Sequence, residues 1–172
     1  EHEKSIADHD EVPFYAIKKY CDDNKMMFHK DEFKDIIYGA TDTINYFKDK
    51  FDRKRPIEVD KTLDTSPSKT NKTPSYPSGH AAQSRIVARY VAGKFPEHEA
   101  NLIEAGNECG YGRVLAGFHY PSDYEAGNLL GEKMYKLMSK ENYIKEMKTF
   151  KTFMESIIDI PRSTYAPGVF DD

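Results

Sequence analysis

Apolar residues recur at three- and four-residue spacing along most of this chain, a pattern typical of amphipathic helices. The pattern predicts five helices, over residues 31–55, 78–94, 97–115, from about 122 onward, and 141–158. The first of them ends before Pro56, because a proline disfavours helical geometry in the residue that precedes it. No segment of the sequence alternates with a two-residue period for long enough to predict a sheet. The expected fold class is therefore all-α, a helical bundle.

The length of 172 residues fits a single domain over residues 1–172. Residues 1–11 are polar and are expected to form a loosely held arm, whereas residues 159–172 are expected to form an extended tail. Residues 57–76 are rich in Ser, Thr and Pro, which predicts an irregular loop, and a loop of this length usually serves a site. Ser122 and Glu125 have the spacing of a capping box, which predicts that the fourth helix begins near Ser122.

Charge and composition narrow the functional classes. The net charge is -4, so the chain as a whole does not attract nucleic acid. No apolar run approaches the roughly 20 residues that cross a bilayer, which predicts a chain without a membrane span. Cys21 and Cys109 are far apart in the sequence, and two buried thiols or one disulfide are both open.

Basic residues are concentrated between positions 48 and 55. If this segment is helical, Lys48 and Arg55 lie about two turns apart, roughly 10 Å along one face. Two cations on one face can converge on a dianion, and a guanidinium can hold two of its oxygens. The intervening Lys50, Arg53 and Lys54 are expected to be solvated.

A second segment, Pro77-Ser78-Gly79-His80, stands directly before a predicted helix. Ser78 is suited to cap that helix, whose free N–H groups and dipole can bind an anion. Gly79 lets the backbone approach a ligand closely, and His80 lies in the first turn beside anything bound there. An ordinary helix cap with an exposed histidine is the alternative interpretation.

A third segment contains Gly112-Arg113, His119 and Asp123. A carboxylate four residues after a histidine can accept its Nδ1–H, which leaves Nε2 free to attack. The same pair would suit a zinc site, but that site would need a third ligand and would leave three cations without a purpose. Fixed cations, a helix N-terminus, two histidines and a carboxylate are what phosphoryl transfer without a metal needs.

These three segments resemble the three-part motif of the type 2 phosphatidic acid phosphatase superfamily. That superfamily also contains the class A bacterial acid phosphatases and the vanadium-dependent haloperoxidases. The resemblance covers Lys48 to Asp123 and departs from the usual motif only at Gly112, where serine is usual. It implies a helical bundle of the acid phosphatase and vanadium haloperoxidase type.

The resemblance also implies an activity, that of a phosphoric monoester hydrolase. His119 would be phosphorylated, His80 would protonate the leaving group and Asp123 would orient His119. The phosphate oxygens would be bound by Lys48, Arg55, Arg113, the Ser78 hydroxyl and the Gly79 N–H. With one histidine neutral and the other charged, the rate is expected to pass through a maximum on the acidic to neutral side.

No metal or other cofactor is implied, although phosphate or vanadate can occupy such a site. The implied partner is a small phosphoester, with a homodimer suggested only by analogy, and a periplasmic or secreted location is favoured over a cytoplasmic one. A vanadium-dependent haloperoxidase is the main alternative, but those enzymes are usually far longer and this chain lacks tryptophan. The second alternative is a phosphate-binding module without catalytic activity.

Three aromatic residues flank the motifs and either line the pocket or pack in the core: Tyr76, Phe118 and Tyr120.

Overall fold

The computed structural model describes residues 12–65 and 68–138, and every regular element in these two ranges is a helix. The predicted all-α class is therefore confirmed. The elements are α2 (Tyr15–Asp23), α3 (Lys30–Phe51), α4 (Pro56–Val59), α5 (Gly79–Lys94), the 3₁₀ turn η1 (Pro96–His98), α6 (Glu99–Leu115) and α7 (Pro121–Met138). The predicted helix over 141–158, the arm 1–11 and the tail 159–172 lie outside the described residues.

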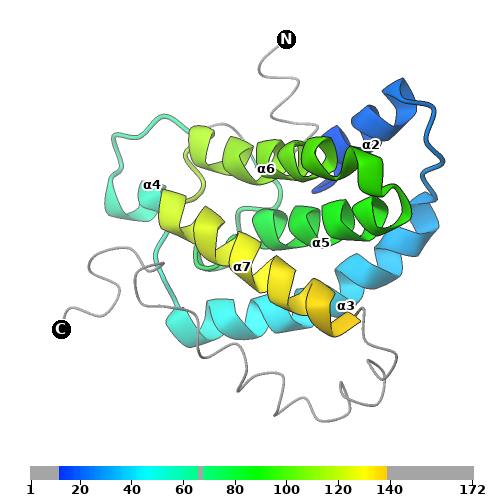
Figure 1. Ribbon diagram of the computed structural model, residues 1–172. Coiled ribbons are helices and arrows are strands. Elements are labelled where there is room, and N and C mark those ends of the chain that lie inside the picture. Colours follow the sequence, from blue (N-terminus) through cyan, green and yellow to red (C-terminus); the bar gives the residue numbers. More distant parts are fainter. Residues whose placement is uncertain (1–11, 66–67, 139–172) are drawn as a thin grey trace.

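Helix α5 lies at the centre of the bundle (Figure 1), with α6 along one side, α7 crossing it and α3 on the remaining side. Its sequence suits this position, because small and β-branched residues let neighbours pack closely all round it. Fully buried members of α5 include Ala81, Ala82, Ile86, Val87 and Ala88. Burial of each aliphatic side chain such as Ile86 stabilises the fold by about 1.5–3 kcal/mol relative to exposure. Packing in the core therefore holds α5 in place. The N-terminus of α5 is the helix end that the sequence assigns to the site.

Two glycines of α7 allow it to cross α5 at very short range. A Cβ at Gly127 would lie 2.5 Å from the backbone oxygen of Ser78, and one at Gly131 would lie 2.6 Å from that of Ala82. No larger residue fits without a shift of backbone. The close crossing brings the first turns of the two helices together, where the Ser78 N–H donates to the Asp123 carbonyl at 2.9 Å.

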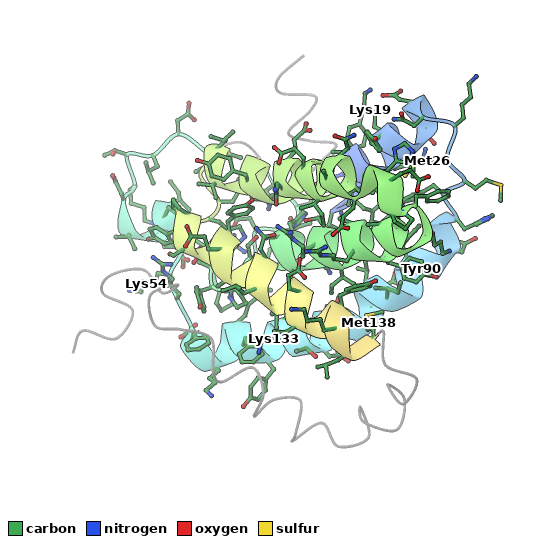
Figure 2. The ribbon with its side chains drawn as sticks, viewed as in Figure 1. Lys19, Met26, Lys54, Tyr90, Lys133 and Met138 are labelled. Atoms are coloured by element: carbon green, nitrogen blue, oxygen red, sulfur yellow. The ribbon has the colours of Figure 1, made fainter. Side chains whose placement is uncertain are left out.

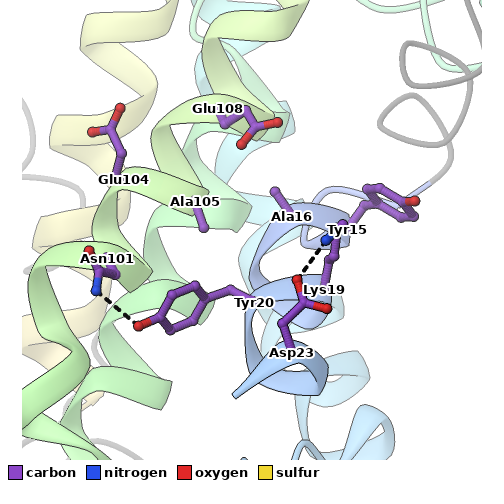
Figure 3. Close-up of a pocket in the computed structure, with 9 residues that line it drawn as sticks. All are labelled: Tyr15, Ala16, Lys19, Tyr20, Asp23, Asn101, Glu104, Ala105 and Glu108. Carbon is purple, nitrogen blue, oxygen red and sulfur yellow. Dashed lines mark hydrogen bonds and ion pairs between the residues drawn. The ribbon is translucent and has the colours of Figure 1, made fainter. Parts of the chain in front are cut away.

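Helix α2, which the apolar pattern did not predict, packs against α6. It buries few apolar side chains, among them Ile17 and Cys21. Polar contacts add to this packing, since the Tyr20 hydroxyl accepts from Asn101 Nδ2 at 2.9 Å (Figure 3) and lies 2.8 Å from His98 Nδ1. The two cysteines are both free and buried, so the possibility of a disulfide is not realised.

The helix ends differ from the predicted ones at three places. Helix α3 ends at Phe51 and not just before Pro56, because Asp52 takes a left-handed conformation at φ 43°. The short helix α4 occupies the start of the predicted loop 57–76. The third difference is in a cap: α7 begins at Pro121, within one residue of the predicted start, but the Asp123 carboxylate accepts the Tyr120 N–H at 2.9 Å, so the expected Ser122–Glu125 capping box is wrong.

The buried faces of α3 and α7 carry apolar residues at helical spacing, among them Ala40, Ile44 and Phe47 of α3 and Leu130 of α7. Two leucines are exposed instead, Leu115 of α6 at 70% and Leu129 of α7 at 38%. Within the described residues, no helix is both long enough and apolar enough to cross a membrane.

Candidate active site

Two of the predicted phosphate ligands come from the region where α3 ends. Lys48 lies in the last turn of α3 and is buried, and its Nζ donates to the Pro74 carbonyl at 2.5 Å. Arg55 lies beyond the left-handed turn, at the N-cap of α4. The two cations therefore do not share one helical face as the sequence suggested, although both reach the same cleft.

The Arg55 guanidinium is fixed by backbone carbonyls on two sides. Its Nε donates to Thr73 O at 2.8 Å and its Nη1 to Phe118 O at 2.9 Å. The same Nη1 lies 3.4 Å from His119 Nε2. The predicted loop 57–76 therefore supplies part of the rim of the site, as its length suggested, and holds a cation against the histidine.

The third predicted cation, Arg113, lies in the last turn of α6 and is only 2% exposed. Its guanidinium carbon lies 4.2 Å from the centre of the Phe118 ring, and its Nη2 donates to Thr70 Oγ1 at 3.1 Å. The next residue back, Gly112, has no atom within 4 Å of the place where a Cβ would lie. A serine, which is usual there in the resembled motif, would fit, so the departure does not disturb the site.

The three cations line one cleft of about 420 Å³ together with Gly79, His80 and His119. Gly79 and His80, in the first turn of α5, line this cleft, while anion binding by the N–H groups of that turn stays a prediction. Ser78 is fully buried behind the cleft wall, and its Oγ accepts from the Ala81 N–H at 3.4 Å. Ser78 is thus the N-cap of α5, as expected, while its role toward phosphate stays a prediction.

The neighbours of His119 indicate which of its ring nitrogens carries the proton. Its Nδ1 lies 3.1 Å from Asp123 Oδ2, and because an ionised carboxylate only accepts hydrogen bonds, Nδ1 carries the proton. Its Nε2 faces the Arg55 guanidinium, which only donates, so Nε2 carries the lone pair. The two neighbours define the same tautomer independently, and the lone pair belongs to the nitrogen near the cations.

Burial and charge displace the pKa values of two groups in the cleft. Burial, the largest influence, and then the charges of Lys48 and Arg55 lower the pKa of His119 to about 3, against the opposing effect of Asp123. Burial, together with the charges of Arg55 and Arg113, lowers the pKa of Lys48 to about 7. Both displacements come from gathering positive charge in a place with little water.

Sequence reasoning missed two residues that contact Asp123. Ser75 Oγ donates to Asp123 Oδ2 at 2.5 Å, and Arg53 Nη1 donates to Asp123 Oδ1 at 2.6 Å. Arg53 was expected to be solvated with Lys50 and Lys54. Those two are exposed, and Lys54 is labelled in Figure 2, but the Arg53 side chain is only 11% exposed. Nothing in a run of basic residues distinguishes the one that turns inward.

The aromatic residues that flank the motifs pack against other side chains and do not line the cleft. Tyr76 and Phe118 are buried in the core, and neither lines the cleft. Tyr120 is part-buried, and its ring lies 3.7 Å below the Arg53 guanidinium carbon. Among the described residues, no three His, Cys, Asp or Glu side chains are grouped so that they could hold a metal ion.

Comparison with known proteins places these features in a family. The sequence profile of the PAP2 superfamily, the type 2 phosphatidic acid phosphatase group that the motifs resemble, matches residues 36–140. This match covers more than half of the chain and contains every predicted site residue. The chain belongs to the PAP2 superfamily.

Individual relatives are acid phosphatases. The acid phosphatase of Zymomonas mobilis is 35% identical over 92 residues, which are 52% of this chain and 35% of the relative. The non-specific acid phosphatase of Salmonella typhi is 42% identical over 57 residues, 33% of this chain and 23% of the relative. That of Providencia stuartii is 31% identical over 84 residues, 48% of this chain and 34% of the relative. The chain thus spans about a third or less of the length of these relatives.

Proposed function

We propose that this chain hydrolyses phosphomonoesters through a phosphohistidine formed at His119, without a metal ion. The observation that carries the proposal is the position of the His119 ring, with Asp123 Oδ2 3.1 Å from Nδ1 and Arg55 Nη1 3.4 Å from Nε2, which favours a lone pair on Nε2. Such a nitrogen is poised to attack an electrophile whose charge the cations hold. The acid phosphatase relatives support phosphomonoesters as the substrate class.

In the first step, the Nε2 lone pair forms a bond to phosphorus while the bond from phosphorus to the ester oxygen breaks. His80 gives its proton to the leaving oxygen as the alcohol departs. Lys48, Arg55 and Arg113 hold the equatorial oxygens, with N–H groups of the α5 first turn. Asp123 accepts the Nδ1–H throughout, so it stabilises the positive charge that develops on the imidazole.

In the second step, water attacks the phosphohistidine in line with the breaking P–N bond. His80, now neutral, removes a proton from that water, and Nε2 of His119 leaves with its electron pair restored. Inorganic phosphate is released and His80 is charged again for the next turnover. Proton transfer by His80 is expected to contribute about 10²–10⁴-fold to the rate.

The proposal is tested with p-nitrophenyl phosphate in the presence of EDTA, comparing the wild type with His119→Ala and His80→Ala. The wild type is expected to turn over, His119→Ala to lose turnover, and His80→Ala to lose about 10²–10⁴-fold. Acid-labile phosphate on His119, trapped by rapid quench and located by mass spectrometry, would identify the intermediate. Near-full activity in His119→Ala would mean that the nucleophile is misassigned.

The same preparation separates the alternatives. Halide oxidation after addition of vanadate and peroxide, without phosphatase turnover, would indicate a haloperoxidase. Tight phosphate binding with no hydrolysis of any ester in a panel of nucleotides, sugar phosphates, pyrophosphate and lysophospholipid would indicate a binding module. Either result would overturn the proposed activity.

A further inference from the structure

Arg53 is held in one position by three contacts with the segment that carries His119 and Asp123. Its Nη1 donates to Asp123 Oδ1 at 2.6 Å and to Ser122 Oγ at 2.9 Å. Its guanidinium also stacks on the Tyr120 ring, 3.7 Å from the ring centre. The side chain of a solvated surface arginine samples many rotamers. The Arg53 side chain is only 11% exposed and makes three contacts, which indicates that its position serves a specific role.

The Asp123 carboxylate divides its partners between its two oxygens. Oδ2 accepts from Ser75 Oγ, from the Tyr120 N–H and from His119 Nδ1. Oδ1 accepts from Arg53. Asp123 itself is fully buried, and a buried carboxylate without a cation would impose its whole negative charge on the imidazole that it contacts.

We propose that Arg53 is a positioning residue: by neutralising Asp123, it keeps the imidazole of His119 uncharged, and so able to attack, in acid solution. Asp123 must fix the tautomer of His119 without protonating the ring, and these two demands conflict. The ion pair with Arg53 resolves the conflict, because the hydrogen bond remains while most of the negative charge is offset. Attack by the uncharged ring rests on the proposed function, whereas the effect of Arg53 on the charge of the ring does not.

Other charged and titratable groups face the same ring from the neighbouring elements. Lys48 approaches from α3, Arg55 from the N-cap of α4, His80 from α5 and Arg113 from α6, and all of these line the cleft. Arg55 contacts the ring directly, at 3.4 Å from Nε2. Arg53 differs from these four because its contacts lie behind the ring, on Asp123, Ser122 and Tyr120. It therefore acts on His119 through Asp123 and not through the substrate.

The pKa of Asp123 reflects this arrangement. Burial would raise the pKa of Asp123, but the hydrogen bond and charge of His119, the hydrogen bond from Ser75 and the charge of Arg53 outweigh it, so the net pKa is lowered. Loss of Arg53 leaves the Asp123 charge uncompensated beside His119. The imidazolium form then becomes easier to form, which is the direction that reduces attack in acid.

The test is Arg53→Gln, with Lys54→Gln as the matched control. Lys54 is the exposed neighbour, so its substitution removes the same charge without the contact to Asp123. In Arg53→Gln, the pKa of the His119 ring, measured by NMR titration from about pH 2 to pH 7, is expected to rise by about 1. The acid limb of kcat is expected to move to higher pH by the same amount, with kcat near the optimum within about threefold of wild type. Lys54→Gln is expected to change neither.

Arg53→Lys provides the conservative rescue. It keeps the charge but loses the guanidinium fork, and the pKa of His119 is expected to stay within about 0.3 of wild type. An Arg53→Gln variant that loses kcat equally at every pH, with an unchanged His119 titration, would make Arg53 merely structural and overturn the proposal. If Arg53→Gln fails to fold, Arg53→Lys decides, because an acid limb displaced by about 1 despite the retained charge would overturn it.

The NMR titration also separates this inference from the proposed function. A wild type without phosphatase turnover would refute the proposed function. The His119 titration needs no substrate, so it would still decide whether Arg53 controls the charge of the ring.

Discussion

Two buried groups in the cleft, His119 and Lys48, set the lower and upper limits of the pH range in which the proposed reaction can run. In the proposed mechanism His119 attacks only when neutral, and its pKa is lowered to about 3, so the neutral ring persists well into acid. Lys48 is proposed to hold the phosphate, which it does only when protonated, and its pKa is lowered to about 7, so its charge is lost as pH rises past neutrality. The two values predict a working range on the acid side of neutral. Part of the fall in rate on the alkaline side is therefore expected to come from Lys48. The motifs alone had explained the rate maximum by the two histidines.

Anion binding is therefore expected to depend on the protonation of Lys48. Sulfate is a suitable probe because it remains a dianion over the whole range. Its affinity for the wild type, measured by isothermal titration calorimetry, is expected to fall above pH 7, by up to about tenfold for each further pH unit. The sign follows from linkage, since a bound dianion favours the charged lysine and the neutral lysine dominates above its pKa.

Lys48→Arg and Lys48→Met are the controls for this prediction. The guanidinium stays charged to far higher pH, so sulfate binding by Lys48→Arg is expected to be nearly flat between about pH 6 and pH 9. Lys48→Met is expected to bind weakly at every pH. A decline in Lys48→Arg as steep as that in wild type would assign the pH dependence to another group.

Residue chemistry made most of the site predictable from the sequence. Lys48, Arg55, His80, Arg113 and His119 line a single cleft, although as many as 71 positions separate the first of them from the last. Arg53 and Ser75 were not predictable, because their importance depends on where their side chains point. Arg53 directly follows the left-handed turn at Asp52, and no spacing rule in the sequence reports that turn.

For the helices, the sequence was sufficient to predict the long elements but not the short ones. The sequence predicted all four of the long helices in the described residues, α3, α5, α6 and α7. Helix α3 buries an apolar stripe, whereas α5 contacts α3, α6 and α7 and is buried on several sides. The apolar pattern missed the nine-residue α2, whose position depends on tertiary contacts such as that of Tyr20 with Asn101. It also could not predict how closely α7 crosses α5, because the glycines that permit the crossing carry no apolar signal.

The close crossing of α5 and α7 gives a stability prediction for Gly131→Ala. The new Cβ would lie 2.6 Å from Ala82 O and 2.8 Å from Arg85 Cβ, so the two helices must move apart. This overpacking is expected to lower the free energy of unfolding by about 1–3 kcal/mol, as measured by urea denaturation.

Gly39→Ala is the matched control, since it makes the same substitution inside α3. No atom lies within 4 Å of the Cβ that it adds, and the position is exposed. Without a clash, only the gain in helix propensity remains, so the variant is expected to be more stable by up to about 1 kcal/mol. Equal effects of the two substitutions would show that the crossing tolerates a methyl group.

At the scale of the whole molecule, the cleft gathers ends of elements that are distant in sequence. It takes cations from α3, from the N-cap of α4 and from α6, a helix N-terminus from α5, and His119 from the connection between α6 and α7. These positive groups repel one another where little water screens them. A bound dianion removes that repulsion and links all of these elements, so the stability of the fold and occupancy of the cleft are coupled.

Sulfate or phosphate is therefore expected to stabilise the whole domain. At a concentration about 100 times the dissociation constant, linkage adds about 2.7 kcal/mol to the free energy of unfolding. For a domain of this size, this corresponds to a rise in Tm of roughly 5–10 °C in a thermal melt. Sodium chloride at equal ionic strength tests for general screening, and Arg113→Gln, which removes one of the buried cations of the cleft, is expected to lose most of the sulfate effect. A rise in Tm that is the same in Arg113→Gln as in the wild type would locate the stabilising anion outside the cleft, and the coupling between site and fold would then be wrong.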